Sequence, residues 1–416
     1  MKVCMIKASV PGPYKTYKQQ RGGPPQNIFS LAAATPSHID VEMIDETASM
    51  EGAALVTADL VVLMMSTPDA PRAYELADGF RRRGIPVVLG GLHATFLPEE
   101  ALDHADAVIL GEAEGVWSEI LEDAKRGDLK AQYRASAPVD MEALNPYPTR
   151  LIRPHAYNGF WSVLVSRGCP FSCSFCLVHR FFDGIRYRPV GAVVDEIRRS
   201  GADWIELHAD NLTHDRDYAM ELFSALKPLD INWVGETTIR IAEDDELLSL
   251  AAESGLRYLL VGLETPSEEA LRSASKGFVR PADAKEYVSR LHDHRIIVDS
   301  SMLFGFDEHD ARIFEEALNF VEYVGIDLSD GIIAIPFPGS KLFRDLDAEN
   351  RILTRDWSLY DGSHAVFQPA RMTPEELEEG QRWYASKYYG LARIARRKIR
   401  QVRDLGLINA AWLGVR

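Results

Sequence analysis

Residues 166–176 read SRGCPFSCSFC and place Cys169, Cys173 and Cys176 on one short segment. The segment follows an apolar run at residues 162–166, which is typical of a buried strand. Thiolates are soft ligands that suit zinc and iron–sulfur clusters. Three thiolates can hold three irons of a four-iron cluster and leave the fourth iron open to another ligand. The spacing therefore predicts a metal centre at the end of a strand, in a reducing compartment.

A zinc site is the alternative interpretation of the same segment. His179 could complete a Cys3His set, although structural zinc is usually held by two separated ligand pairs. The remaining cysteine, Cys4, lies more than 160 residues away in an apolar run, where we expect a small buried hydrophobic residue. The single loop of three cysteines favours the iron–sulfur cluster.

The composition excludes several classes of protein. The chain has 416 residues, four cysteines and a formal net charge of −16. Four cysteines cannot form a secreted disulfide framework. The acidic charge argues against general affinity for nucleic acid or an anionic membrane, although it leaves room for a local basic patch. The sequence begins without a signal-peptide pattern, and no apolar run reaches the roughly 18 residues of a transmembrane segment. We expect a cytoplasmic protein with no transmembrane segment.

Strand and helix patterns alternate on the carboxyl side of the cysteine segment. About six such units predict a partial or complete α/β barrel over residues 161–360, with its chemistry at the carboxyl ends of the strands. The expected strands are residues 162–166, 204–208, 233–236, 258–263, 297–304 and 328–335. The expected helices are residues 192–200, 217–226, 243–254, 282–294 and 310–324.

Residues 1–135 show a second alternating pattern, which predicts a doubly wound, Rossmann-like parallel sheet. Its expected strands are residues 3–8, 41–44, 60–65, 86–89 and 107–110, with helices at 73–80 and 117–124. Ligands of such sheets bind beyond the carboxyl ends of the strands, where small and polar turn residues stand. The alternative is that these glycines only make tight turns. The turn residues expected to bind a ligand are Thr67, Gly90, Gly91, Thr95, Gly111 and Glu112.

Two further segments complete the organisation. Residues 136–160 contain four prolines and no helical period, which indicates a linker. Residues 361–416 are expected to form a helical C-terminal cap. Within it, residues 392–403 (ARIARRKIRQVR) carry six basic side chains. These form either a solvated helix face or an anion-binding surface.

The cysteine motif, with Phe175 before its last cysteine, resembles the signature of the radical S-adenosylmethionine (radical SAM) enzymes. The resemblance continues at residues 206–211, 235–238 and 261–265, although this family usually has a glycine-rich motif where residues 206–211 stand. It implies a [4Fe-4S] cluster on Cys169, Cys173 and Cys176, with S-adenosylmethionine on its open iron. The residues that it implies for cofactor binding are Phe175, His208, Asp210, Glu236, Thr238 and Glu264. The alternatives for His208, Asp210 and Glu236 are that they position substrate or only form hydrogen bonds at the top of the barrel. It identifies no catalytic side chain.

Residues 90–115 are similar to the cobalamin-binding domain that precedes many radical SAM domains. The resemblance implies that residues 1–135 bind cobalamin. The Asp-x-His-x-x-Gly motif that supplies a cobalt ligand in other cobalamin proteins is absent, and His93 lies on a different turn. We therefore expect cobalamin without a histidine on cobalt. The alternative is a relic domain that no longer holds the cofactor.

The two resemblances together imply a reaction class. S-adenosylmethionine would be cleaved reductively to a 5′-deoxyadenosyl radical, which abstracts hydrogen from an unactivated carbon of a small-molecule substrate. Cobalamin-dependent C-methylation is the favoured outcome, with flavodoxin or ferredoxin as a reducing partner. The alternatives are a radical cyclase or oxidative rearrangement, as in the porphyrin-cyclase branch, a cobalamin or redox sensor, and a zinc-stabilised interaction module.

Overall fold

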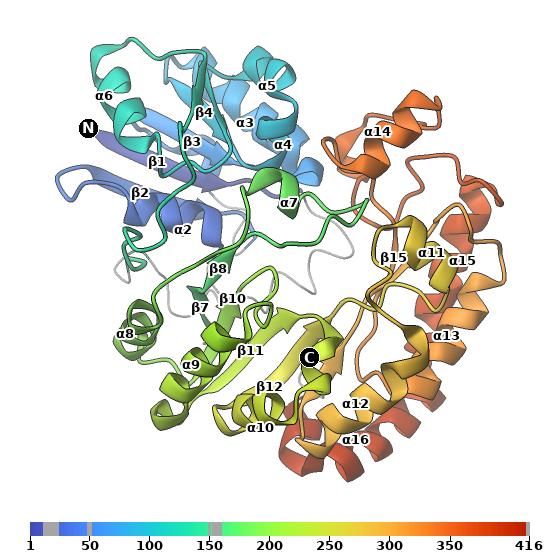
Figure 1. Cartoon of the computed structure of the whole chain (residues 1–416). Coiled ribbons are helices and arrows are strands. Elements are labelled where there is room, and N and C mark those ends of the chain that lie inside the picture. The colour runs from blue at the N-terminus through green and yellow to red at the C-terminus, as the bar shows by residue number, and fades with distance from the viewer. Residues whose placement is uncertain (11–24, 48–51, 149–150, 152–159, 413–416) are drawn as a thin grey trace.

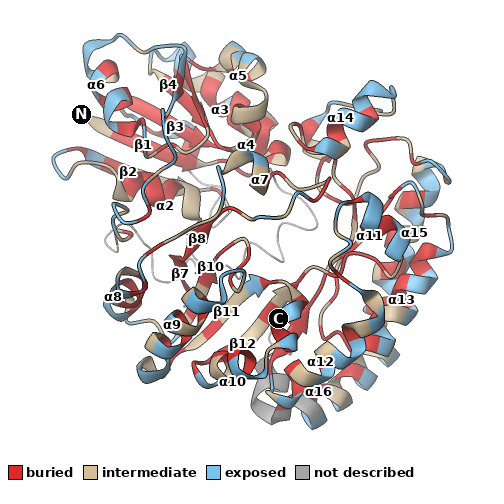
Figure 2. Ribbon diagram, in the orientation of Figure 1, coloured by how far each residue is buried: buried red, intermediate tan, exposed pale blue. Residues whose placement is uncertain are grey.

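A computed structural model of the chain describes residues 1–10, 25–47, 52–148, 151 and 160–412, except for the side chains of 404 and 406–412. Two parallel α/β parts lie one above the other, and the C-terminal helices flank the second part (Figure 1). Buried residues fill both sheets and the inner faces of their helices (Figure 2). Among the described residues, no helix combines the length and the apolar character needed to cross a membrane.

The first part is a six-stranded parallel sheet in the order β2-β1-β3-β4-β5-β6. Strands β1, β3, β4 and β5 read as continuous apolar runs because both of their faces are covered. The sequence predicted the first five strands but not β6, in which only Tyr133 is buried. The strands are β1 Lys2–Lys7, β2 Asp40–Asp45, β3 Leu60–Met64, β4 Val87–Gly90, β5 Ala107–Leu110 and β6 Gln132–Arg134. The helices are α2 Gln26–Ala33, α3 Ala70–Arg82, α4 Leu92–Phe96, α5 Pro98–His104 and α6 Trp117–Arg126.

The second part is a curved five-stranded parallel sheet in the order β13-β12-β11-β10-β7, next to the parallel pair β14-β15. The described strands therefore form a partial barrel. They are β7 Phe160–Leu164, β10 Trp204–His208, β11 Asn232–Thr237, β12 Leu256–Val261, β13 Ile297–Asp299, β14 Met302–Phe304 and β15 Gly331–Ile333. Its helices are α8 Val190–Ser200, α9 Arg216–Leu226, α10 Asp245–Glu253, α11 Glu268–Ser273, α12 Ala284–Asp293 and α13 Ile313–Val324.

One expected strand, residues 297–304, is two strands in the structure. β13 pairs with β12, whereas β14 pairs with β15. The chain changes partner at Ser300, whose backbone N–H donates to the carbonyl of Leu328 and whose hydroxyl accepts from the N–H of Leu263. The polar residues Asp299, Ser300 and Ser301 interrupt the expected strand at the position where the chain changes partner.

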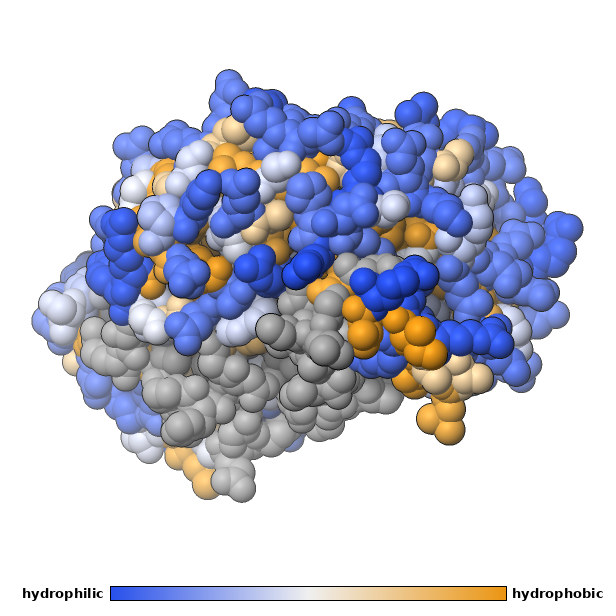
Figure 3. Space-filling model, turned by 90° about the horizontal axis from the view of Figure 1, so that it is seen from below, coloured by the Kyte–Doolittle hydropathy of each residue, from blue (hydrophilic) through white to orange (hydrophobic). Residues whose placement is uncertain are grey.

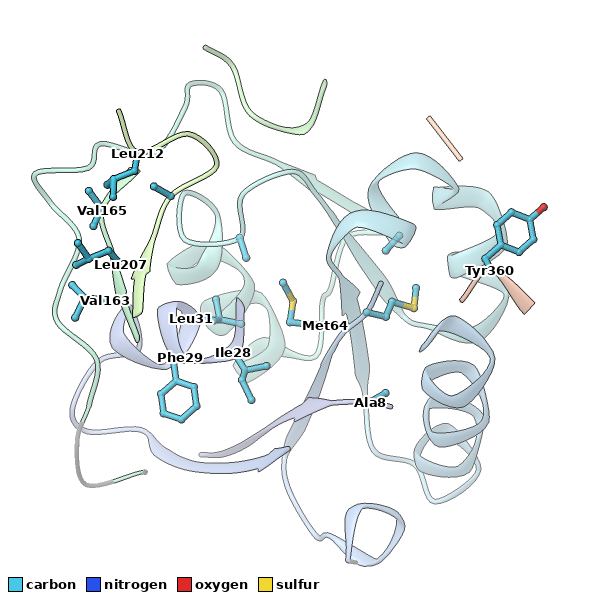
Figure 4. Close-up of a cluster of buried hydrophobic side chains, with 14 of the residues drawn as sticks. Ala8, Ile28, Phe29, Leu31, Met64, Val163, Val165, Leu207, Leu212 and Tyr360 are labelled. Atoms are coloured by element: carbon cyan, nitrogen blue, oxygen red, sulfur yellow. The ribbon is translucent and has the colours of Figure 1, made fainter. Parts of the chain in front are cut away.

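The two parts share one continuous apolar core. Side chains of the first sheet and of the barrel belong to the same buried cluster, several of which Figure 4 shows. Helices α14 Lys341–Ala348, α15 Pro374–Tyr388 and α16 Leu391–Trp412 follow the barrel. Trp357 begins a short 3-10 helix after α14 and reaches back to the first part, where its indole N–H donates to Glu100 Oε1 at 2.8 Å.

Candidate active site

The cysteine loop follows β8 (Ser166–Arg167) and leads into α7 (Val178–Phe181). Gly168 begins the loop at φ +91°, and a Cβ there would lie 1.9 Å from the carbonyl oxygen of Gly184. Only glycine tolerates this close approach. The N–H of Gly168 donates to Asp210 Oδ2 at 2.7 Å, so the loop is attached to the end of β10. Ser174, between the second and third cysteines, bonds through its backbone to Ala274 and Leu342.

The three loop cysteines are free thiols on the same side of the barrel. Burial raises the pKa of all three, and that of Cys176 to about 11. A raised pKa means that forming the thiolate costs free energy. Metal binding offsets this cost, because a metal ion stabilises the thiolate form. Among the described residues, no three His, Cys, Asp or Glu side chains converge on a point that could hold a single ion. A four-iron cluster does not need such a point, since each thiolate binds a different iron, and the loop therefore fits the cluster.

Two neighbouring side chains at the end of β10 hold the loop. Asp210 was expected to bind a cofactor, and the structure uses it to anchor Gly168. Burial raises the pKa of Asp210, and the hydrogen bond from Gly168 opposes that rise. Asn211 hydrogen-bonds to Cys169 and accepts a bond from Thr237 Oγ1 at 2.9 Å. Asn211 was not among the predicted site residues, because its role depends on the path of the loop above it.

Glu264 forms a buried ion pair with Lys276 at 2.5 Å. Burial lowers the pKa of Lys276, but the charges of Glu264 and Cys173 outweigh this effect and raise it. The Lys276 ammonium lies 5.8 Å from the centre of the Phe175 ring, so it connects the cysteine loop to the top of the barrel. Lys276 was missed, since nothing in its loop sequence distinguishes it from a solvated lysine.

The other residues expected to contact S-adenosylmethionine are separated in space. His208 lies exposed at the end of β10 and lines the cavity between the two parts. Thr238 lines a different surface hollow, beside Phe171. Glu236, at the end of β11, lies close enough to Lys276 to contribute to its raised pKa.

A cavity of about 430 Å³ lies between the carboxyl ends of the two sheets. This volume is in the range of small-molecule sites. Gly111 has φ +85° and open space where a Cβ would stand, so a ligand can approach this turn closely. The wall from the first part includes Met64, Met65, Ser66, Gly91, Leu92, Gly111 and Glu112. The wall from the second part includes Leu164, Arg167, Leu177, Val178, Phe181, Phe182, His208 and Asp210.

Three of the expected cobalamin residues lie behind this wall. The Thr95 hydroxyl donates to the carbonyl of Gly91 and accepts from the N–H of Gly111, so it holds the two turns together. Gly90 packs on Met64, whose sulfur would lie 2.7 Å from an added Cβ. Thr67 is buried at the start of a short 3-10 helix. Packing against Met64 therefore explains the glycine at position 90, which is a different reason from the tight turn considered as the alternative.

A buried ion cluster joins the two parts beside the cavity. Arg167 contacts Glu112 Oε1 at 2.7 Å and Glu114 Oε1 at 2.5 Å, and it donates to the Ser30 hydroxyl. Arg186 contacts the second oxygen of Glu112 at 2.9 Å. Burial lowers the pKa of Arg167, but the two carboxylates outweigh it and raise that pKa. Burial likewise raises the pKa of Glu114, but Arg167 outweighs it and lowers that pKa. The residue directly before the cysteine loop is therefore attached to the turn after β5.

His93 does not line the cavity. Its side chain is buried, with Nε2 at 3.1 Å from Glu100 Oε1 and the ring edge against Trp357. Among the described lining residues, the first part contributes no histidine. This arrangement agrees with the expectation that His93 is not a cobalt ligand.

The comparisons with known proteins assign the family. The B12 binding domain model matches residues 21–121, and the Radical SAM superfamily model matches residues 163–321. The chain is 31% identical to a bacteriochlorophyllide d C-12(1)-methyltransferase of Chlorobaculum tepidum, over 85% of this chain and 80% of that protein. The chain belongs to the radical SAM enzymes that carry a cobalamin-binding domain.

Further relatives of this cobalamin-dependent radical SAM enzyme agree with that assignment. A bacteriochlorophyllide d C-8(2)-methyltransferase of the same organism is 29% identical over 83% of this chain and 80% of its own length. The radical SAM methyltransferase TsrM of Kitasatospora setae shares the fold, with a TM-score of 0.67 at 15% identity, over 84% of this chain and 75% of that one. The family assignment favours an enzyme over the zinc-module and sensor alternatives. The cofactors of this family are a [4Fe-4S] cluster, S-adenosylmethionine and cobalamin.

Proposed function

We propose that this enzyme transfers a methyl group from cobalamin to an unactivated carbon of a small-molecule substrate. The observation that carries the proposal is the single cavity bounded by Gly91 and Gly111 of the cobalamin-binding domain and by Leu177 and Val178 directly after the cluster loop. A methyl donor and a radical source are useful to each other only if one substrate carbon can reach both. The full-length relatives named as methyltransferases support the same reaction.

The residues of the chain have distinct roles in this proposal. Cys169, Cys173 and Cys176 hold the cluster, with Asp210 and Asn211 fixing the loop. When bound, the cluster supplies the electron that cleaves S-adenosylmethionine, and cobalamin supplies the methyl group.

The Glu264–Lys276 ion pair and the cavity-lining side chains of the second part have further roles. We place S-adenosylmethionine beside Phe175, Glu264 and Lys276, because these side chains meet next to Cys173. The apolar side chains of Leu177, Phe181 and Phe182 exclude water from the reacting carbon.

The cobalamin site is tested by filling the cavity from the first domain. Leu92→Trp adds bulk at the amino end of α4, in the cavity wall. We expect at least about tenfold weaker cobalamin binding, because overpacking a site is costly. Leu353→Trp is the matched control, since Leu353 is half exposed and lies outside the described cavity wall. Cobalamin absorbance after reconstitution and desalting measures the retained cofactor.

One outcome would contradict cobalamin binding by the first domain, and another would contradict the expected absence of a histidine ligand on cobalt. Wild-type protein that retains no cobalamin would favour the relic domain. Splitting by a histidine nitrogen in the EPR spectrum of the cobalt(II) form would show that a histidine binds cobalt. His93 is buried against Glu100 and does not supply that ligand in this structure.

The reaction class is tested by counting products under anaerobic, reducing conditions. Methyl transfer through cobalamin uses one S-adenosylmethionine to methylate cobalt and another to form the radical. We therefore expect S-adenosylhomocysteine and 5′-deoxyadenosine in about equal amounts. Liquid chromatography with mass spectrometry measures both, with methyl-labelled S-adenosylmethionine to follow the transferred carbon. The bacteriochlorophyllides acted on by the relatives are the first candidate substrates.

Other product ratios would identify the competing reactions. 5′-Deoxyadenosine without S-adenosylhomocysteine, together with an unmethylated product, would indicate a cyclase or an oxidative rearrangement. If neither product forms although both cofactors are loaded and substrate is present, the result would favour the sensor interpretation. We propose flavodoxin or ferredoxin as the reducing partner, and replacing dithionite by either protein in the same assay tests that proposal.

A further inference from the structure

We propose that helix α16 binds the surface of an anionic lipid membrane. The helix carries an exposed apolar stripe formed by Leu391, Ala395, Ile399 and Val402. Their spacing of four, four and three residues places them on one helical face. Leu391 is 86% exposed, Ile399 74% and Val402 41%. Soluble proteins rarely expose such a row without a partner.

The opposite face of α16 is firmly attached to the protein. The Arg397 guanidinium lies 3.8 Å from the centre of the Tyr388 ring and donates to the carbonyl of Tyr388. Gln401 is buried and donates to the carbonyl of Asp327. Arg400 donates to the carbonyl of Ile326 at 2.8 Å. The exposed stripe is therefore the outer side of a docked helix and does not form part of the core of this chain.

The side chains that flank the stripe are basic. Residues 391–403 contain six basic and no acidic residues, of which Arg393 pairs with Glu322, and Arg397 and Arg400 face the protein. Arg396 and Arg403 follow one edge of the stripe by their helical positions, and Lys398 follows the other. Figure 3 views the molecule from below relative to Figure 1, and hydrophobic patches lie beside strongly hydrophilic residues on that face.

This combination fits a lipid surface better than other occupants. An apolar stripe between basic side chains is the pattern of a helix that lies in a membrane interface, where Lys and Arg meet anionic headgroups. A second copy of the chain would bring two sets of the same positive charges together, because a twofold contact uses the same patch on both subunits. Nucleic acid would match the charge but leave the apolar stripe unused.

The test uses the full chain and lipid vesicles. We expect the wild-type protein to float with vesicles of phosphatidylcholine and phosphatidylglycerol, and much less with phosphatidylcholine alone. Binding should weaken at high salt, because salt screens the attraction of the basic residues. The double variant Leu391→Glu/Ile399→Glu should bind the mixed vesicles at least about tenfold more weakly, since it removes apolar contact and adds repulsion.

Leu55→Glu is the matched control, because Leu55 is 84% exposed and lies in the first domain, away from α16. It should bind vesicles as the wild type does, and circular dichroism should show that all variants are folded. The proposal is overturned if the wild type does not float with the anionic vesicles, or if the double variant floats equally well. A concentration-dependent dimer that the double variant abolishes, without vesicle binding, would assign the stripe to self-association instead.

Discussion

Replacing Cys173 by alanine should remove the iron–sulfur cluster and all reductive cleavage of S-adenosylmethionine. Cys173 is the most buried of the three loop cysteines, and the backbone on both sides of it is fixed, by Asp210 at Gly168 and by Ala274 at Ser174. The one other cysteine, Cys4, lies on β1 in the other domain and cannot replace it. Iron and sulfide analysis after anaerobic reconstitution measures the loss, together with the absorbance of the cluster.

Cys4→Ala is the control for this experiment. Cys4 is a buried apolar contact whose thiol pKa is raised by burial to about 12, so it stays a neutral thiol. The variant should keep the iron and sulfide content of the wild type. Stoichiometric zinc without iron in the wild type after anaerobic purification would contradict the cluster assignment, and so would an unchanged iron content in Cys173→Ala.

Replacing Arg167 by methionine should destabilise the enzyme by about 3–5 kcal/mol, because it leaves the buried Glu114 without its counterion and Glu112 with Arg186 alone. Glu112 and Glu114 both contact Arg167, and all three side chains are almost fully buried. The same change releases the turn after β5 from the residue before the cluster loop, so retained cobalamin and product formation should fall together. Urea unfolding monitored by circular dichroism gives the change in the free energy of unfolding.

Two further variants distinguish the destabilisation caused by an unpaired buried charge from that caused by losing one arginine side chain. Arg167→Met combined with Glu114→Gln should recover much of the stability, because Glu114 is then neutral and Glu112 still pairs with Arg186. Arg216→Met removes an exposed arginine that pairs with Asp244 and Glu246, and it should cost less than about 1 kcal/mol. Equal effects of Arg167→Met and Arg216→Met would refute the role of the ion cluster.

The sequence alone predicted the features that depend on local order. The cysteine spacing predicted the cluster loop, since the ligand set lies within eight residues. Apolar runs predicted most strands of both sheets, because strands covered on both faces must be apolar throughout. The missing cobalt-ligand motif predicted that His93 is not a cobalt ligand, and the structure places His93 outside the cavity wall.

The tertiary structure decided which residues meet. The sequence predicted Glu112 as a cofactor contact, and the fold places it in the cavity wall and also pairs it with Arg167 and Arg186 from the other domain. Lys276 reaches Glu264 and the cysteine loop because α11 returns the chain to the top of the barrel. These partners are far apart in sequence and carry no local pattern. Periodicity and motif spacing report only the neighbours of a residue along the chain, so contacts between domains become visible only once both sheets are folded against each other.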